Sequence, residues 1–437
     1  MPNTTAPPAN DQTTKPSSEQ APAPTSTKGA DLTETLIVSP AADDSIRSFE
    51  YRASDEELAD LKRRIAATRW PQRERVADAT QGVQLATIQK IADYWANSYD
   101  WRRCEAQLNA LPNFITNIDG LDIHFIHVKS KHPNALPVII THGWPGSIIE
   151  NLKLIDPLTD PTSYGGNASD AFDVVIPSMP GYGFSGKPTE TGWTPERIGR
   201  AWATLMERLG YQRYVAQGGD WGALIVDYMG VEPVPGLIGI HTNMAGALPP
   251  EMEAAASSGS VPSGLDEEEK RALAQVSFFY KYGLGYAIEM GNRPQTLYGL
   301  VDSPIALAAW IIDHDIWSYK LIARVFDGAE AGLTRDDILD NITLYWLTST
   351  GVSAAHLYWE RLNANGTFAF FNAKQVTVPV VVSNFPDELA PIPRKWAEKA
   401  YPTLAHHQDH ASGGHFAAWE NPQALTEDMR TGFRSLR

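Results

Sequence analysis

A glycine-rich turn between a predicted strand and a predicted helix constrains the fold of this chain more than any other feature. Its sequence is Gly218-Gly219-Asp220-Trp221-Gly222, with the apolar run 214–216 before it and the apolar run 223–226 after it. Small residues allow a tight strand-to-helix turn that lifts its central side chain above a sheet. Asp220 is therefore either a reactive carboxylate or an ordinary cap of the following helix. The turn alone does not decide between the two.

The segments around this turn alternate between short apolar strands and amphipathic helices. Strand signals lie at 121–128, 137–140, 172–177 and 214–217. The clearest helix begins after Thr194 as N-cap and ends at Gly210. Such alternation is typical of an α/β fold with a mostly parallel sheet.

The remaining segments flank or interrupt this core, which we assign to residues 131–247 and 371–437, with a further strand at 376–382. Residues 46–130 predict a helical N-terminal region that leads into the first strand and contains a helix from Ser54 to Trp70. Residues 248–370 lack strand signals and predict a helical cap over the carboxyl edge of the sheet, where α/β folds bind ligands. Residues 1–45, rich in Pro, Ala, Thr and Ser, predict a disordered tail.

Composition excludes several classes of protein. The formal net charge of -16 argues against a nucleic-acid partner and against an anionic membrane surface. No apolar run approaches the roughly 18 residues of a membrane helix, so we predict no membrane anchor and a soluble, cytoplasmic protein. Cys104 is the single cysteine, which excludes an internal disulfide and a cysteine-based metal site.

Two later segments supply partners for Asp220. Phe385-Pro386-Asp387-Glu388 offers an acid just after a predicted strand, and Gly413-Gly414-His415 offers a histidine near the C-terminus. The chain order nucleophile, acid, histidine is that of the α/β-hydrolase fold. Histidine is the side chain best suited to proton transfer near neutral pH. With these partners, the reactive-carboxylate interpretation of Asp220 is favoured over the helix cap.

A loop at 141–146, Thr-His-Gly-Trp-Pro-Gly, follows a buried strand. In this fold the corresponding loop and the residue after the nucleophile donate backbone N–H groups to an oxyanion. The candidate donors are therefore Trp144 and Trp221. Pro145 suits a tight turn that a cis peptide would serve, and we expect His142 to order this turn.

These sequence motifs resemble those of the microsomal-type epoxide hydrolases of the α/β-hydrolase superfamily. We expect this chain to be a soluble form of that type. The resemblance runs from about Phe49 to Arg430 and includes the N-terminal helical segment. It implies that Glu388 rather than Asp387 is the acid. It also implies that Tyr286 and Tyr358, in segments that look like the family's own, donate hydrogen bonds to the epoxide oxygen.

The resemblance implies hydrolysis of a small apolar or aryl epoxide to a vicinal diol through an ester on Asp220. Water activated by His415 would then hydrolyse the ester. Asp220, Trp144, Trp221 and the two tyrosines would surround the substrate. We expect no cofactor and no metal. The sequence does not decide whether the chain forms a homodimer.

The sequence leaves three other interpretations open. A haloalkane dehalogenase would use the same Asp and His, and a non-catalytic carrier of apolar molecules would use the same fold without them. A metal site could recruit His406, His407, Asp409, His410 and His415. The spacing of His406 and His410 would suit one helix face, but Gly413 and Gly414 favour a loop.

Overall fold

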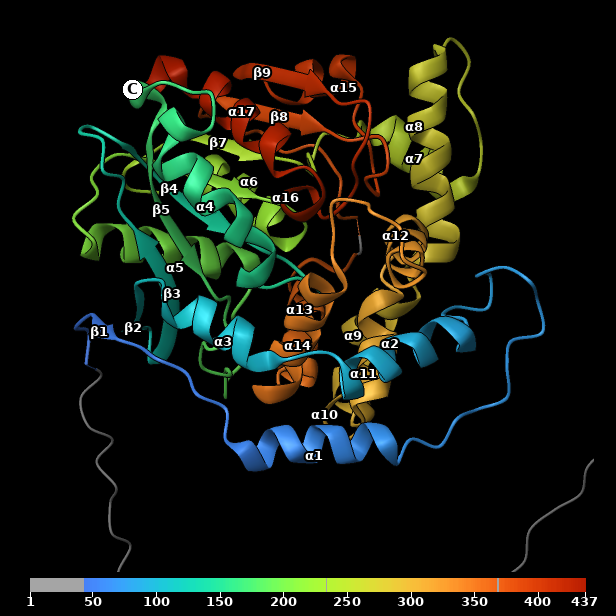
Figure 1. The fold of residues 1–437 in the computed structure, drawn as a ribbon. Coiled ribbons are helices and arrows are strands. Elements are labelled where there is room, and N and C mark those ends of the chain that lie inside the picture. Colours follow the sequence, from blue (N-terminus) through green and yellow to red (C-terminus); the bar gives the residue numbers. More distant parts are fainter. Residues whose placement is uncertain (1–42, 233, 368) are drawn as a thin grey trace, which may run out of the picture. The chain divides into compact units, whose positions relative to one another are not determined.

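The computed structural model describes residues 43–232, 234–367 and 369–437, so nearly all of the tail expected at 1–45 lies outside the described residues. A nine-stranded sheet runs through the described chain in the order β1-β2-β3-β5-β4-β6-β7-β8-β9 (Figure 1). The strands are β1 (Arg47–Ser48), β2 (Asn113–Ile118), β3 (Leu121–Val128), β4 (Leu136–Thr141), β5 (Phe172–Pro177), β6 (Tyr214–Gly218), β7 (Leu237–Thr242), β8 (Val380–Asn384) and β9 (Leu404–Asp409).

Only the first part of the sheet is antiparallel. β1, β2, β3 and β5 pair antiparallel in that order, and every pair from β5 through β4 to β9 is parallel. This confirms the predicted α/β fold with a mostly parallel sheet. β4 and β6 are neighbours, with Thr141 opposite Gly218. Because parallel strands end at the same edge, the loop after β4 and the turn after β6 lie side by side.

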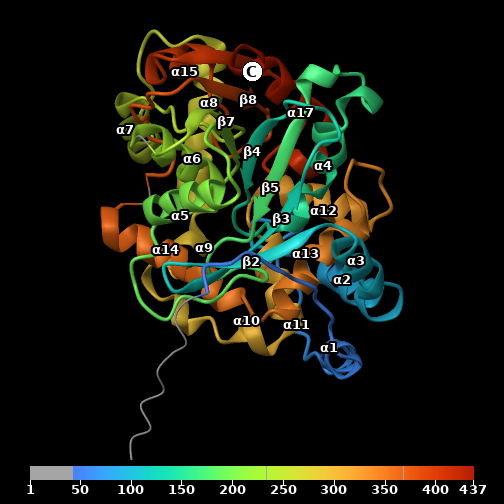
Figure 2. The same ribbon diagram turned by 90° about the vertical axis from the view of Figure 1, so that its left-hand side faces the viewer.

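Helices cover both faces of the sheet (Figure 2). One face carries α5 (Pro195–Arg208) and α6 (Trp221–Val231), and the other carries α4 (Leu152–Thr159) and α17 (Pro422–Gly432). The short helices α15 (Arg394–Ala400) and α16 (Ala417–Glu420) belong to the C-terminal part. The strands between these layers are buried, and Ile139, Val175 and Ala216 are fully inaccessible. Burial on both faces explains why these strands consist of continuous apolar runs.

The described part of 248–370 is helical and contains no strand. It comprises α7 (Pro250–Ser258), α8 (Glu267–Phe278), α9 (Gly285–Asn292), α10 (Gly299–Asp302), α11 (Pro304–Ile312), α12 (Ile316–Phe326), α13 (Arg335–Leu347) and α14 (Gly351–Asn365). Among the described residues, no helix combines the length and apolar character needed to cross a bilayer.

The N-terminal helices α1 (Asp55–Ala66), α2 (Leu85–Asn97) and α3 (Trp101–Asn109) contact this helical insertion (Figure 1). Helix α13 receives several of the bonds. The Trp95 indole donates to Thr343 at 3.0 Å, and the Tyr99 hydroxyl donates to Asp340 at 2.7 Å. Arg103 pairs with the same Asp340 carboxylate at 2.6 Å. The N-terminal segment thus fixes α13 in place.

Several local predictions were wrong. The first helix has the expected capping box at Ser54 but ends at Ala66, well before Trp70. The strand expected at 376–382 begins at Val380, because Pro379 has no N–H for a sheet ladder. The region 46–130 also contains β1 and β2 before the expected first strand, and β7 was not predicted. The spacing of His406 and His410 is compatible with one helix face, but His406 lies in β9 and His410 directly follows that strand.

Candidate active site

Asp220 occupies the predicted turn between β6 and α6, and its backbone is strained. Its φ of 50° and ψ of -125° lie outside the regions that non-glycine residues ordinarily adopt. The flanking glycines leave room for this turn. A Cβ on Gly218 would approach the Gly222 carbonyl oxygen to 2.1 Å, and one on Gly222 would approach the Thr141 carbonyl oxygen to 2.0 Å. Only glycine fits at either position.

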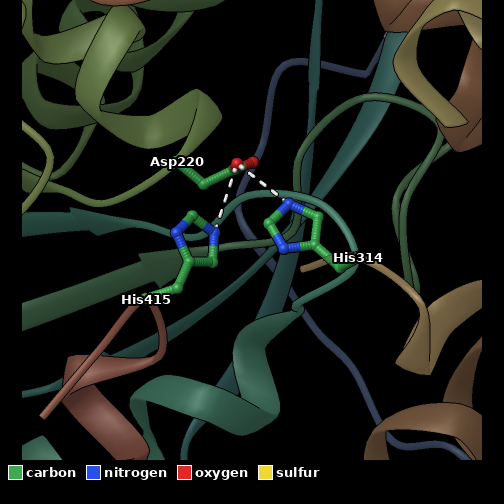
Figure 3. A group of neighbouring side chains, drawn as sticks. All are labelled: Asp220, His314 and His415. Carbon is green, nitrogen blue, oxygen red and sulfur yellow. Dashed lines mark ion pairs between the residues drawn. The ribbon is translucent and has the colours of Figure 1, made fainter. Parts of the chain in front are cut away.

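The two carboxylate oxygens of Asp220 have different partners. Oδ1 accepts a hydrogen bond from the Trp144 amide at 2.7 Å. Oδ2 faces His415 Nε2 at 3.4 Å (Figure 3). Burial raises the pKa of Asp220, but the hydrogen bond and charge of His415, together with the Trp144 amide, outweigh it and lower the pKa below its usual value. The side chain is thus an ionised carboxylate with one oxygen held and the other directed at a base.

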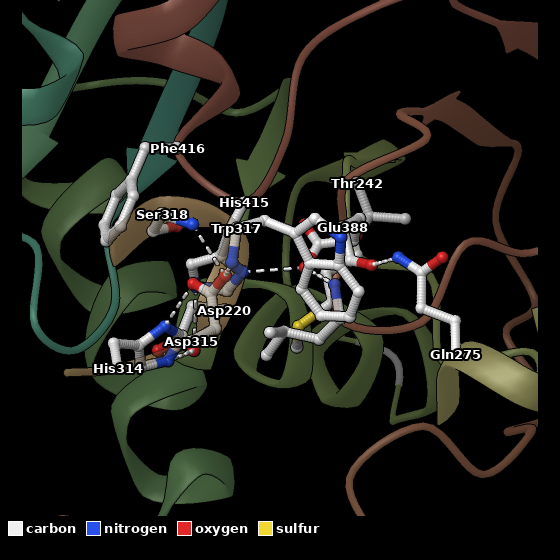
Figure 4. Close-up of polar contacts among 12 residues, drawn as sticks. Asp220, Thr242, Gln275, His314, Asp315, Trp317, Ser318, Glu388, His415 and Phe416 are labelled. Atoms are coloured by element: carbon white, nitrogen blue, oxygen red, sulfur yellow. Dashed lines mark hydrogen bonds and ion pairs between the residues drawn. The ribbon is translucent and has the colours of Figure 1, made fainter. Parts of the chain in front are cut away.

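His415 is oriented from behind by Glu388 (Figure 4). Its Nδ1 lies 2.7 Å from Glu388 Oε1, and both side chains are about 1% exposed. Burial lowers the pKa of His415, but Glu388 and Asp220 together raise it well above its usual value. Asp387, the alternative acid, is exposed. The structure therefore places Glu388, and not Asp387, against the histidine.

The loop after β4 is fixed by bonds from the helical insertion. Asn341 on α13 donates to the Pro145 carbonyl at 2.7 Å, and Tyr345 on α13 donates to the Gly146 carbonyl at 2.7 Å. The Trp144–Pro145 peptide is cis. His142 bonds within the loop to the Gly143 carbonyl at 3.0 Å and accepts from the Met179 amide at 3.2 Å. These bonds hold the Trp144 amide against Asp220.

The second candidate donor is the backbone amide of Trp221, the first residue of α6. N–H groups in the first turn of a helix have no partner within the helix. Such a group carries the positive end of the helix dipole. The role of the Trp221 amide as a second donor therefore stays a prediction.

The two tyrosines come together from separate helices. Tyr286 lies on α9 and Tyr358 on α14, and their ring centroids are 5.8 Å apart. The Tyr286 ring stacks on Trp144 at 4.8 Å, and the Tyr358 ring meets Trp221 edge-on at 4.7 Å. Burial is the main cause that raises the pKa of each hydroxyl well above its usual value, and the negative charge of Asp220 also contributes in both rings. Both remain protonated donors at neutral pH.

Three groups at this site were not predicted from the sequence. His314 and Asp315 lie between α11 and α12, and His314 Nε2 is 3.9 Å from Asp220 Oδ2 (Figure 3). Glu150 lines the cavity that contains Asp220 and His415, and burial of its carboxyl raises its pKa to about 8. A charged triplet, Asp313-His314-Asp315, directly follows the most apolar stretch of the insertion, and this was the available signal.

The C-terminal histidines do not gather as a metal site would require. His406 and His410 both face Asp428, with His410 Nε2 2.6 Å from its Oδ2. Within the described ranges, the one compact group of potential metal ligands is Asp220, His314 and His415, whose ligand atoms lie within 4.8 Å of one another. Since Asp220 and His415 already form an ordered nucleophile–base pair, we interpret the group as acid–base machinery.

Comparison with known proteins identifies the family to which the chain belongs. The family model described as the epoxide hydrolase N terminus matches residues 46–151, and the α/β hydrolase fold model matches residues 137–280. A relative from Stigmatella aurantiaca (strain DW4/3-1), provisionally named an epoxide hydrolase, is 48% identical over 90% of this chain and 86% of its own length. Epoxide hydrolase 1 of Sus scrofa is 37% identical over 89% of both chains.

A solved structure extends the similarity to three dimensions. The crystal structure of juvenile hormone epoxide hydrolase from the silkworm Bombyx mori superposes with a TM-score of 0.81 at 32% identity. It covers 90% of this chain and 96% of the silkworm chain. These similarities favour epoxide hydrolysis over the dehalogenase and carrier interpretations. The chain belongs to the microsomal-type epoxide hydrolases, which join an epoxide hydrolase N-terminal segment to an α/β-hydrolase fold.

Proposed function

We propose that this enzyme opens an apolar epoxide through a covalent ester on Asp220 and then hydrolyses that ester to a vicinal diol. The observation that carries the proposal is that the two carboxylate oxygens of Asp220 have different partners. Oδ1 is bound by the Trp144 amide at 2.7 Å, whereas Oδ2 is 3.4 Å from His415 Nε2. Oδ2 is therefore the attacking oxygen, and Oδ1 becomes the carbonyl oxygen of the ester.

The first half-reaction needs an ionised nucleophile and an acid for the epoxide oxygen. An epoxide carbon is saturated and requires in-line displacement, which a carboxylate can perform without a base. The lowered pKa of Asp220 keeps it ionised. Tyr286 and Tyr358 keep their protons and can stabilise the alkoxide as it forms.

The second half-reaction begins from a changed electrostatic state. Esterification removes the negative charge of Asp220, which is one of the groups that raise the pKa of His415. The proton affinity of His415 then falls, and it can accept a proton from water. Glu388 keeps Nδ1 protonated and Nε2 free. The oxyanion on Oδ1 is stabilised by the Trp144 amide, with the Trp221 amide beside it, a contribution of roughly 3–4 kcal/mol per donor in other enzymes.

The surroundings of Asp220 favour an apolar or aryl substrate. A cavity borders the nucleophile and both tyrosines and is otherwise mostly apolar. Its lining residues are Asp220, Trp221, Leu224, Met244, Phe279, Tyr286, Tyr358, Phe370, Phe371 and Leu389. Burial of an apolar substituent in such a cavity would supply binding energy in proportion to its area. We therefore expect aryl epoxides to be turned over more efficiently than small polar ones.

A single turnover in heavy-oxygen water tests the covalent mechanism. With enzyme in excess over styrene oxide, the first diol should contain light oxygen from Asp220 at the newly formed hydroxyl. Heavy oxygen in that first diol would exclude the ester. In parallel, His415→Gln should accumulate an adduct on the peptide containing Asp220, visible by mass spectrometry, and Asp220→Asn should form none.

A further inference from the structure

His314 lies next to His415, and both histidines face the carboxylate of Asp220 (Figures 3 and 4). His314 is 1% exposed, and its Nε2 is 3.9 Å from Asp220 Oδ2. Its ring lies 4.5 Å from the His415 ring at an interplanar angle of 32°, and 4.9 Å from the Tyr286 ring.

Asp315 determines which nitrogen of His314 carries a proton. Asp315 Oδ2 is 3.1 Å from His314 Nδ1. Although burial raises the pKa of Asp315, hydrogen bonds from His314 and Ser318 contribute to lowering the pKa below its usual value, so the carboxyl is ionised. An ionised carboxylate only accepts hydrogen bonds, so Nδ1 donates. In neutral His314, Nε2 is then an acceptor, and it is buried with no hydrogen-bond partner among the described residues.

His314–Asp315 therefore repeats the arrangement of His415–Glu388. In each pair a buried carboxylate holds Nδ1–H and leaves Nε2 directed at Asp220 Oδ2. One ring nitrogen of each histidine and a carboxylate oxygen of Asp220 all lie within 4.8 Å of one another. Two hydrogen bonds of about 2.8 Å span up to roughly 5.6 Å, so a single water can donate to both nitrogens.

A water held in this way has both O–H groups directed at imidazoles, which leaves a lone pair for the Asp220 ester carbon. We propose that His314, oriented by Asp315, is a second histidine that binds and orients the hydrolytic water in the second half-reaction. This inference rests on the proposed ester mechanism. It assigns His314 no part in opening the epoxide.

The water oxygen bonds to Cγ of esterified Asp220 while one water proton passes to His415 Nε2 and the other stays hydrogen bonded to His314 Nε2. The Cγ–Oδ2 bond then breaks, and the proton on His415 passes to the departing diol oxygen. Asp220 is regenerated with an oxygen from water. The second water proton remains on the new carboxyl and then passes to the alkoxide oxygen left at the tyrosines by epoxide opening, so that Asp220 is again ionised and the diol is neutral. His314 neither gains nor loses a proton, so it lowers the barrier by fixing the direction of attack.

Two variants test the proposal by different changes. His314→Phe keeps an aromatic ring among the rings of Trp144 and Tyr286 but removes the acceptor. Asp315→Asn should change the tautomer of His314, moving its proton from Nδ1 to Nε2. Asp315 Oδ1 accepts from the amides of Trp317 and Ser318 and caps α12, so an asparagine oxygen should keep that place and its amide nitrogen should face His314. Nδ1 then accepts and Nε2 becomes a donor.

Rapid-quench experiments with styrene oxide separate the two half-reactions. At each time point, the amount of ester on Asp220 and the amount of free diol are measured. In both variants, ester breakdown should slow by about 10-fold or more, while ester formation stays within threefold of the parent, so ester accumulates. The matched control is His356→Gln, a partly buried histidine of α14 that lines a different groove. It should change neither rate.

Three results would overturn the assignment. Unchanged ester breakdown in either variant would show that His314 does not orient the water. An equal loss in both half-reactions would show a structural role. Slowing in His314→Phe without slowing in Asp315→Asn would remove the tautomer argument. If the parent enzyme forms no ester, the proposed function itself fails, which is a distinct outcome.

Discussion

Replacing Gly143 by alanine should separate the Trp144 amide from Asp220. A Cβ at Gly143 would lie 2.1 Å from Asp220 Oδ1 and 2.5 Å from its Cγ. Non-bonded heavy atoms sit at about 3.5 Å or more, so the loop or the carboxylate must shift by about 1 Å. The backbone at Gly143 is not in the left-handed region, so the effect is steric and involves no backbone strain.

The magnitude follows from what that shift removes. Misplacing a reacting group by 1 Å can cost about 10²-fold in rate, and loss of one oxyanion donor costs about 10²- to 10³-fold in kcat. Because one displacement causes both losses, we expect kcat for styrene oxide to fall by about 10²- to 10³-fold. Overpacking should reduce the free energy of unfolding by only about 1–3 kcal/mol, so the protein should remain folded.

The assay is diol formation under saturating epoxide, with circular dichroism to verify folding. Gly299→Ala in α10 is the matched control, since its new methyl group would meet only the Ala306 Cβ, at 3.9 Å. A folded Gly143→Ala enzyme with kcat within threefold of the parent would refute the reasoning. The contact between the loop and the nucleophile would then be dispensable or easily relaxed.

Other predictions concern separate groups. Tyr286→Phe and Tyr358→Phe should each slow ester formation by about 10²-fold and leave ester breakdown unchanged in quench experiments; equal slowing of both steps would contradict their role. Burial raises the Glu150 pKa from 4.5 to about 8, so the parent should lose stability as the pH rises through this window. The stability advantage of Glu150→Gln should therefore grow from pH 4.5 to 8 in urea unfolding, and a pH-independent difference would contradict this. Lys374 pairs with buried Asp227 at 3.3 Å, so Lys374→Met should cost about 3–5 kcal/mol of unfolding free energy, and a loss below 1 kcal/mol would argue against an ionised pair.

The sequence predicted the parts of the site whose geometry is local to a few consecutive residues. The turn at Asp220 needs small neighbours within two positions, and the loop at Trp144 carries its own proline and glycines. Both strings can be read directly because strand, turn and helix follow one another along the chain. The roles of Glu388, Tyr286 and Tyr358 came only from family resemblance, since nothing local distinguishes them from other acids and tyrosines.

The parts that were missed depend on long-range packing. His314 reaches Asp220 because α11 and α12 are placed by the rest of the insertion and by the N-terminal helices. No pattern within a dozen residues specifies such an arrangement. Likewise, β7 contains Gly239, which weakens its strand signal, and β2 became recognisable only through its antiparallel pairing with β3.

Helix α13 connects features of the molecule that are distant in sequence. It receives bonds from the N-terminal helices on one side and donates bonds to the carbonyls of Pro145 and Gly146 on the other. The position of the Trp144 amide is therefore a property of the complete assembly. In a chain in which only the sheet and its flanking helices had folded, the loop after β4 that contains Trp144 would lack the bonds from α13. The Trp144 amide would then not be held against Asp220. Catalytic competence should consequently appear late in folding, and activity should report on docking of the N-terminal segment as well as on the chemistry of the nucleophile.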